Sequence, residues 1–281
     1  MALHLGISPC PNDTYIFSAL IQGRVPVPGG IGPLSTHFAD VEELNALARE
    51  RRLDVTKVSV SAVADILDEY VVLHAGGALG RGCGPLLIAP RPVSADDLRT
   101  APIAIPGALT TANLLLSLHN GFFGPRTELV FDRIMPALTQ GEYAAGVIIH
   151  ESRFTYADHG FSLVLDLGAW WEQTTGAPIP LGVIVARRSL GEGVLRRIGA
   201  LVRASLEDAT ANPEPGMPFI RSHAQEMEES VLRRHIAAFV NEFSLDLGEE
   251  GRGAVARLVA MAAELRGISL PAGKPMFAPR P

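Results

Sequence analysis

Residues 3–17 read LHLGISPCPNDTYIF, and this stretch decides the class of fold. Leu3 to Ile7 is short and apolar, which predicts a buried strand, and the two prolines that follow predict a rigid loop. Asp13 or Thr14 is predicted to cap the helix that comes next. A strand, a loop and a helix N-terminus in this order present backbone N–H groups to an anion. The opening of the chain therefore predicts an α/β protein with a binding loop at the end of its first strand.

The alternation of strand and helix continues through the first two-thirds of the chain, which predicts an α/β class with mainly parallel strands. This rhythm restarts near Leu86 and again after Pro180. We therefore expect two lobes. Residues 1–88 and 181–281 form the first, which contains both termini, and residues 89–180 form an inserted second lobe. A single doubly wound sheet is the alternative. The Pro-rich tail from Pro271 is predicted to be poorly ordered or packed as coil.

Composition excludes several classes of protein. Of the 281 residues 47% are hydrophobic and 19% charged, so a sizeable core is expected and global disorder is not. The net charge of −6 and an aromatic content of 6% argue against nucleic acid as a partner. Cys10 and Cys83 cannot form a disulfide framework, and no signal peptide or membrane-spanning run is visible. We expect a soluble, reduced, cytoplasmic protein that is not inserted in a membrane.

Three familiar kinds of site are not predicted. The glycine-rich run 76–84 is followed by Pro85, where a dinucleotide-binding loop has its third glycine, so we interpret it as a close-packed hinge. The eight histidines are scattered, and His150-Glu151 lacks a second histidine four residues on, so no metal site is expected. No G-x-S-x-G elbow of a serine hydrolase occurs.

Five positions remain as candidates for chemistry, and each has a structural alternative. Lys57 lies in an alternating strand and is one of only two lysines, so it is either an anion ligand at the end of a parallel strand or a solvated edge residue. His150 ends an apolar strand, where an imidazole suits general acid–base work, although most single histidines are structural. Thr110-Thr111 either binds a carboxylate or caps a helix. Cys10 is either a nucleophile or a packed loop thiol.

Six segments carry a resemblance to a known family. They are SPCPNDT at 8–14, TKVS at 56–59, GGALGRGCGPL at 76–86, PGALTTA at 106–112, IIHESRFTY at 148–156 and LGAWWE at 167–172. In this order, and over most of the chain, they make it similar to the 1,4-dihydroxy-6-naphthoate synthases of the futalosine route to menaquinone. The Pro-rich tail carries no resemblance.

The resemblance implies a two-lobed fold like that of the type II periplasmic binding proteins, with two crossing hinge strands and the site in a cleft between the lobes. It implies a lyase that converts cyclic dehypoxanthinyl futalosine, a small-molecule carboxylate, into 1,4-dihydroxy-6-naphthoate and dihydroxyacetone without a cofactor. His150 matches the proposed general base. The positions matching substrate contacts are Lys57, Val58, Ser59, Thr111 and Ala112, and further cleft candidates are Asn45, Cys10 and Thr110.

Three rival functions share parts of this pattern. A chorismate dehydratase of the same pathway has the same fold, but the IIHES and LGAWWE segments favour the synthase. A non-catalytic small-molecule binding protein of the same architecture is the second rival, because fold alone does not separate binder from enzyme. A ligand-sensing regulator would need a basic DNA-binding module, which the acidic chain does not show. A homodimer is also left open, since Val231, Ile236 and Phe239 are predicted to form either core or a dimer face.

Overall fold

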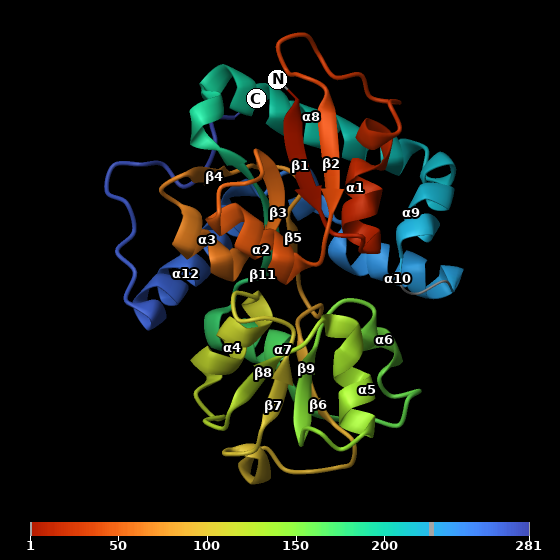
Figure 1. The fold of residues 1–281 in the computed structure, drawn as a ribbon, viewed down its shortest axis with the longest axis vertical. Coiled ribbons are helices and arrows are strands. Elements are labelled where there is room, and N and C mark those ends of the chain that lie inside the picture. Colours follow the sequence, from red (N-terminus) through yellow and green to blue (C-terminus); the bar gives the residue numbers. More distant parts are fainter. Residues whose placement is uncertain (1, 225–227, 281) are drawn as a thin grey trace. The chain divides into compact units, whose positions relative to one another are not determined.

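The chain divides into two compact units, coloured along the sequence in Figure 1. The computed structural model describes residues 2–224 and 228–280. The first unit contains residues 1–80 and 180–281, and the second contains residues 81–179. The predicted boundary after residue 88 falls inside strand β6 (Leu86–Ala89), which pairs with strands of the second unit.

The first unit is built on a mixed sheet with the strand order β2-β1-β3-β11-β4, and β5 also pairs with β11. Its strands are β1 (Leu3–Ile7), β2 (Leu34–Phe38), β3 (Val55–Ser59), β4 (Tyr70–Val72), β5 (Ala78–Gly80) and β11 (Ile179–Arg187). Strand β1 runs parallel to β2 and β3, whereas β11 runs antiparallel to β3 and β4. The prediction of a mainly parallel sheet is therefore wrong, because a strand distant in sequence returns through the centre.

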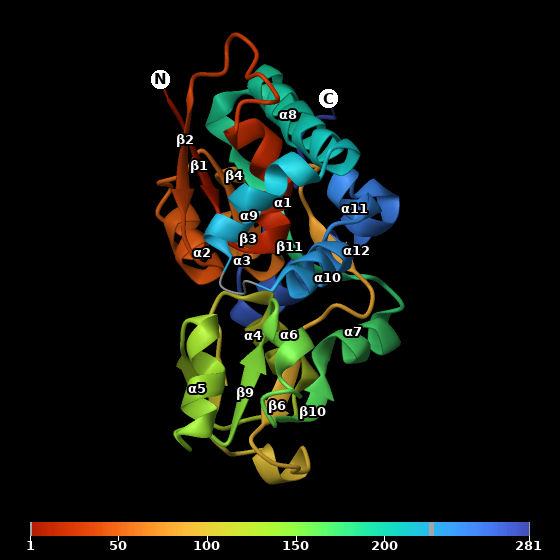
Figure 2. The same cartoon turned by 90° about the vertical axis from the view of Figure 1, so that its right-hand side faces the viewer.

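Helices cover both faces of this sheet. Figure 2 shows α8 running beside α1, and side chains of both helices join the main core with Leu5 of β1. On the opposite face Gly6 lies against Leu44 of α2, and elsewhere α12 packs on α3. The helices are α1 (Pro11–Ile21), α2 (Val41–Arg49), α3 (Val60–Ile66), α8 (Glu192–Ala211), α9 (Met217–His223), α10 (Glu229–Phe239), α11 (Glu242–Leu245) and α12 (Gly248–Arg266).

Helix α1 begins earlier than the sequence predicts. Its first residue is Pro11 and its N-cap is Cys10, so Asp13 is the third helical residue and not the cap. Proline suits the first helical position, because its missing N–H would have no partner there and its φ is already helical. The earlier start turns the Asp13 side chain inward, where it is 1% exposed.

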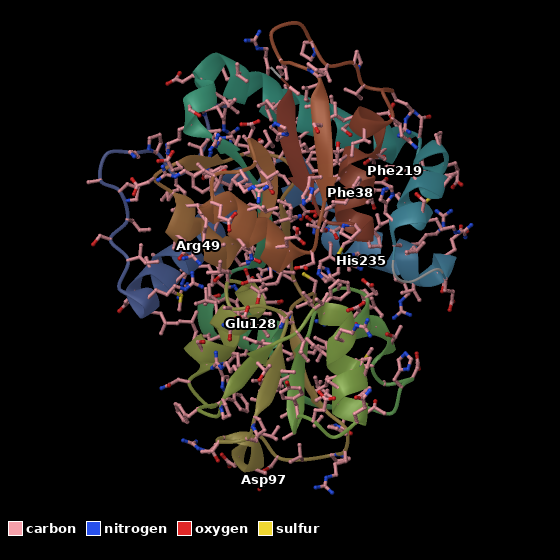
Figure 3. The ribbon with its side chains drawn as sticks, in the orientation of Figure 1. Phe38, Arg49, Asp97, Glu128, Phe219 and His235 are labelled. Atoms are coloured by element: carbon pink, nitrogen blue, oxygen red, sulfur yellow. The ribbon has the colours of Figure 1, made fainter. Side chains whose placement is uncertain are left out.

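The helices near the C-terminus belong to the core of the first unit. Val231 and Phe239 of α10 are buried, and Ile236 packs against the main core cluster. At the end of β2, Phe38 packs on Phe219 of α9 with ring centroids 6.3 Å apart (Figure 3). The three α10 side chains that were open between core and dimer face are thus core. None of the described helices is long and apolar enough to cross a bilayer.

The Pro-rich tail is packed rather than poorly ordered. The Val72 N–H donates to the Met276 carbonyl at 2.9 Å, and the Ala278 N–H donates back to the Val72 carbonyl at 2.8 Å. Nε2 of His74 lies 2.8 Å from the Ala278 carbonyl oxygen. The tail therefore extends the edge of the first sheet beside β4.

The second unit holds a five-stranded sheet with the order β10-β6-β9-β7-β8. Strand β7 is parallel to β8 and β9, and β6 is antiparallel to β9 and β10. Its remaining elements are β7 (Ile103–Ile105), β8 (Arg126–Glu128), β9 (Ala145–Ile148), β10 (Ser162–Asp166), α4 (Thr111–His119), α5 (Ile134–Thr139), α6 (Ser152–Thr155) and α7 (Leu167–Thr175). After β8 ends at Glu128, Phe131–Arg133 forms a 3₁₀ helix.

Two glycines explain why distant segments of the second unit fit together. A Cβ placed on Gly84 would lie 2.3 Å from the Cα of Gly168, so the two backbones touch where side chains cannot be accommodated. Beside them, the Gly82 N–H donates to the Glu172 carboxylate at 2.7 Å. The GCGPL and LGAWWE segments therefore meet at this contact.

A Gly84→Ala substitution is expected to destabilise the protein. The added methyl group meets backbone that cannot swing aside, and overpacking of this kind costs about 1–3 kcal/mol. Denaturant unfolding would measure the loss. Gly253→Ala is the matched control, because nothing lies within 4 Å of its Cβ position in α12, and it should be neutral or slightly stabilising. Equal stability of the two variants would contradict the close contact.

Candidate functional site

A buried ion pair forms the polar centre of the first unit. Nζ of Lys57 lies 2.5 Å from Oδ1 of Asp13, and the two residues are 4% and 1% exposed. Strand β3, which carries Lys57, lies between β1 and β11, so the interpretation of Lys57 as a solvated edge residue is wrong. Gly182 of β11 leaves room for the lysine stem, since a Cβ there would lie 2.7 Å from Cε of Lys57.

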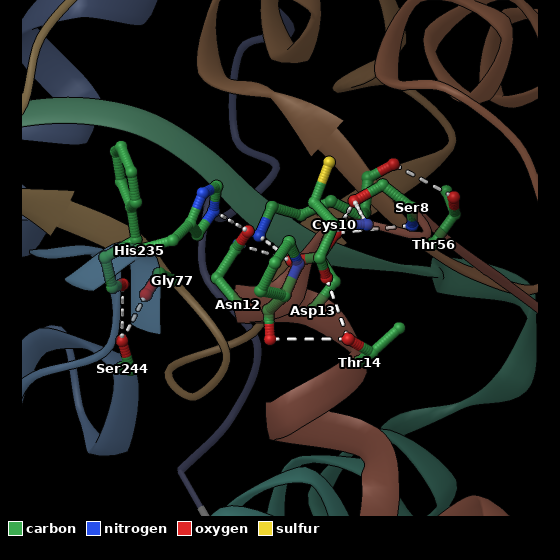
Figure 4. A network of polar contacts seen from close by, with 12 residues as sticks. Ser8, Cys10, Asn12, Asp13, Thr14, Thr56, Gly77, His235 and Ser244 are labelled. Atoms are coloured by element: carbon green, nitrogen blue, oxygen red, sulfur yellow. Dashed lines mark hydrogen bonds and ion pairs between the residues drawn. The ribbon is translucent and has the colours of Figure 1, made fainter. Parts of the chain in front are cut away.

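The Asp13 carboxylate is held by three residues (Figure 4). Oδ1 accepts from Lys57 and, at 2.8 Å, from Nδ2 of Asn12. Oδ2 accepts from the hydroxyl of Ser8 at 2.7 Å and from the Ser8 N–H at 3.3 Å. Both oxygens are therefore satisfied inside the protein, as a buried carboxylate requires.

A histidine from α10 completes this network. Nε2 of His235, which is 1% exposed, lies 3.0 Å from Oδ1 of Asn12. Because the Asn12 oxygen accepts, Nε2 is the protonated ring nitrogen in this arrangement. Figure 4 shows His235 beside Asn12, so residues of α1, β3 and α10 meet at one point.

Ser59, at the carboxyl end of β3, is held by Asn45. The Ser59 N–H donates to Oδ1 of Asn45 at 2.8 Å, and Nδ2 of Asn45 donates to the Ser59 hydroxyl oxygen at 3.2 Å. Nδ2 also donates to Glu42 at 3.0 Å. Asn45 is fully buried, so it supports Ser59 from behind rather than offering a surface to a ligand.

The other predicted residues of the first unit are enclosed. The Val58 side chain is fully buried in the sheet, where Val58 is paired with Val183. Cys10 is 4% exposed and caps α1 through its backbone. In the second unit, burial raises the pKa of the Cys83 thiol to about 11, so it stays protonated at neutral pH.

The start of α4 brings together the predicted residues of the PGALTTA segment. Thr110 is the N-cap: its hydroxyl accepts from the Asn113 N–H at 3.2 Å and donates to the Gly107 carbonyl at 2.8 Å. That hydroxyl is thereby used, which favours the capping interpretation for Thr110. Thr111 and Ala112 follow as the first two helical residues, both buried, at the end of the helix that attracts anions.

Replacing Thr110 by alanine is expected to lower the free energy of unfolding by about 0.5–2 kcal/mol, the usual cost of losing an N-cap. Thr110→Ser keeps the hydroxyl and should retain most of the stability. Thermal unfolding of the two variants beside the parent protein would measure this difference. An alanine variant as stable as the serine variant would contradict the capping role.

His150 lies in a turn of the second unit. Strand β9 ends at Ile148, so His150 follows it by two residues instead of standing at its tip. Its φ is 57°, in the left-handed region that residues other than glycine seldom adopt. The Phe131 ring meets the imidazole edge-on, with centroids 4.7 Å apart.

The turn that carries His150 is anchored by the helix that follows it. Arg153 of α6 donates to the Gly84 carbonyl and, at 3.4 Å, to Asp166. Asp166 in turn caps α7 by accepting from the Ala169 N–H at 2.9 Å. Strained backbone persists where the surroundings over-determine it, and such strain is concentrated at functional sites. The turn at His150 combines a strained backbone with contacts that anchor it.

Within residues 2–224 and 228–280, no three His, Cys, Asp or Glu side chains gather as metal ligands would. The first unit offers the ammonium of Lys57 and the hydroxyl of Ser59, and the second unit offers the helix amides at the start of α4, all of which donate hydrogen bonds. Such donors suit a carboxylate or a developing oxyanion.

We did not predict from the sequence a role for Ser8, Asn12 or His235, and we did not predict Asp13 as the counter-ion of Lys57. A lysine inside an apolar strand requires a buried counter-charge, and Asp13 follows the neighbouring strand, so that partner had a visible signal. His235 shares the apolar stripe of α10 with Val231, Leu232 and Phe239. A histidine on an apolar stripe indicates a buried polar contact.

The fold defines the class of protein first. The structure is similar to a ligand-binding component of an ABC-type import system from Staphylococcus aureus, with a TM-score of 0.70 and 10% identity, covering 100% of this chain and 97% of that one. The protein therefore has the periplasmic-binding-protein-like α/β fold, with two sheets and their helices.

The particular family follows from sequence. Residues 3–264 match a family described as menaquinone biosynthesis. A 1,4-dihydroxy-6-naphthoate synthase of Thermus thermophilus is 53% identical, over 98% of this chain and 99% of its own length. The enzyme of the same name from Streptomyces coelicolor is 46% identical, over 93% of both chains. The chain belongs to this family of menaquinone-biosynthesis enzymes.

Proposed function

We propose that this protein converts cyclic dehypoxanthinyl futalosine into 1,4-dihydroxy-6-naphthoate and dihydroxyacetone, with His150 as the general base. Identity to two synthases over nearly the whole chain supports the reaction. The assignment of the base rests on one structural observation: His150 is held at φ 57° in an anchored turn directly after β9. A strained backbone conformation that the surroundings maintain supports a functional role for the side chain that it orients.

The proposed chemistry needs few parts. Cleaving the substrate ring by an elimination or retro-aldol-type step requires a base at a carbon acid and donors for the oxyanion that develops. His150 is assigned the base role. The Ser59 hydroxyl is assigned as an oxyanion donor, because Asn45 fixes its oxygen while its own proton has no acceptor within the described parts of the chain. Aromatisation of the product supplies driving force, so the proposal includes no cofactor.

Lys57 is assigned as the ligand of the substrate carboxylate, and the start of α4 is the alternative. Lys57 supplies an ammonium whose three protons meet a single protein acceptor among the described residues, Asp13. The start of α4 supplies the Ala112 N–H, which at the second helical position has no carbonyl four residues back to bond within the helix. Both donors favour a carboxylate over a neutral group.

Turnover of defined substrates tests this function. The purified protein is incubated with cyclic dehypoxanthinyl futalosine or with chorismate, and products are identified by mass spectrometry. The proposal predicts the naphthoate from the first compound and no change in the second. Dehydration of chorismate would instead indicate the sister enzyme of the pathway. Tight binding of either compound without conversion would indicate a binding protein of this fold.

A further inference from the structure

The Asp13–Lys57 pair is asymmetric in its hydrogen bonds. The carboxylate receives four donors from Lys57, Asn12 and Ser8, at 2.5 to 3.3 Å. The ammonium, in contrast, donates to one acceptor within the described residues, although it carries three protons and is 4% exposed. A buried donor with protons to spare is costly unless a ligand accepts them.

We propose that Asp13 is a positioning residue for Lys57, and that Asn12 and His235 hold Asp13 in place for that purpose. This inference deepens the proposed function and rests on it, since it takes the substrate carboxylate as the acceptor for the remaining ammonium protons. Asp13 fixes one proton of the ammonium and thereby sets the direction of the other two. The substrate then meets an oriented donor and not a mobile lysine.

Electrostatics give Asp13 a second effect on the same group. A carboxylate 2.5 Å from Nζ attracts the ammonium directly and so offsets part of the cost of burying it. Because Asp13 is itself surrounded by the donors of Ser8 and Asn12, its negative charge is spread over them and opposes an incoming carboxylate less. The pair as a whole is neutral, so recognition depends on the direction of the ammonium protons.

His235 fixes the orientation of the Asn12 side-chain amide, which lies between His235 and Asp13. Its Nε2–H donates to Oδ1 of Asn12, which leaves Nδ2 of Asn12 facing Oδ1 of Asp13. If the Asn12 amide were turned over, its oxygen would face the carboxylate and repel it. His235 thus acts on Lys57 through two intervening residues, from a helix more than 170 positions away in sequence.

The lysine content of the chain permits a direct test by nuclear magnetic resonance. Lys57 and Lys274 are the only lysines, so protein labelled with ¹⁵N at lysine Nζ gives two signals, and Lys274→Arg assigns them. The Lys57 ammonium is expected to exchange its protons slowly in the parent protein. Asp13→Asn should shift that signal and speed its exchange, and Asp13→Glu should recover part of the effect.

Two further variants make the resonance test specific. Ser8→Ala keeps every charge and should shift the Lys57 signal less than Asp13→Asn does, so it serves as the reporter if Asp13→Asn does not fold. Asp65→Asn is the matched control, because it breaks a partly buried ion pair with Arg266. It should leave the Lys57 signal unchanged. Fast exchange at Lys57 in the parent protein, or an unchanged signal in both Asp13→Asn and Ser8→Ala, would overturn the inference.

Kinetics separate positioning from a structural role. Asp13→Asn should raise KM by about tenfold or more, as a charge-assisted contact with the substrate loosens, and should change kcat less. His235→Gln should raise KM by a smaller factor. A fall in kcat at constant KM would overturn the inference. If the parent protein is inactive but the resonances behave as expected, the proposed substrate is refuted. The positioning of Lys57 by Asp13 is then still supported.

Discussion

His150→Asn is expected to lower kcat by about 10²- to 10⁴-fold, the range that general base catalysis contributes. Asparagine suits this position because it tolerates the left-handed backbone that His150 adopts at φ 57°. The substitution therefore keeps the turn while removing the group that accepts a proton. Steady-state kinetics and circular dichroism on the same preparation would give the rate and confirm folding.

The control for His150→Asn is another histidine of the same unit. His159 is exposed in a turn of the second unit, and His159→Asn should keep the parent kcat. A folded His150→Asn variant with near-parental kcat would remove His150 from the mechanism. Glu151 and Cys10 would then be the next groups to examine as proton acceptors.

Lys57→Met is expected to be the most destabilising of the site substitutions. It leaves the Asp13 carboxylate, 1% exposed, without its cation, and removing one partner of a buried pair costs about 3–5 kcal/mol. The variant should therefore unfold at a markedly lower denaturant concentration, and a change in its KM could not be interpreted alone.

The double variant Asp13→Asn/Lys57→Met separates stability from binding. It removes both charges, so it should regain most of the lost stability, while the ammonium that binds the substrate is still missing. Its KM should stay at least about tenfold above the parent value. A stable double variant with the parental KM would contradict the role of Lys57 as a carboxylate ligand.

Local sequence patterns were sufficient to predict the elements whose structure depends on residues close in sequence. Strand β1 has the predicted bounds Leu3–Ile7, and the loop and helix after it follow in the expected order. The strand predicted after the glycine-rich run is β6, and Gly76, Gly77 and Gly84 are closely packed as expected, while the interpretation of the run as a hinge stays a prediction. In each case a short apolar run or a proline acts within a few residues.

Long-range pairing was the part that could not be predicted. Strand β11 enters the first sheet between β3 and β4, more than 100 residues after both of them, and this insertion is what buries Lys57. An alternating pattern around Lys57 is equally consistent with an edge strand, because the pattern contains no information about a distant partner. The tail was predicted to be either poorly ordered or packed as coil, and for the same reason its pairing with Val72 could not be predicted.

The sequence predicts candidate residues of the site but not the residues that hold them in place. Lys57 was visible as a rare lysine in a strand and Ser59 followed from the family resemblance, whereas Asp13 was interpreted as a helix cap. The earlier start of α1 at Pro11 changes that role, since Asp13 then lies one turn inside the helix and faces β3. A shift of three residues in the position of the N-cap, from Asp13 to Cys10, thus decided whether a counter-ion was recognised.

A single-turnover experiment tests the central claim most directly. Parent protein and His150→Asn, each in excess over cyclic dehypoxanthinyl futalosine, are mixed with it, and the naphthoate formed is followed by rapid quenching and mass spectrometry. The account predicts that the parent converts all bound substrate, while the variant binds it and converts it at least about a hundredfold more slowly. Equal rates in the two proteins, or substrate recovered unchanged from the parent, would contradict it.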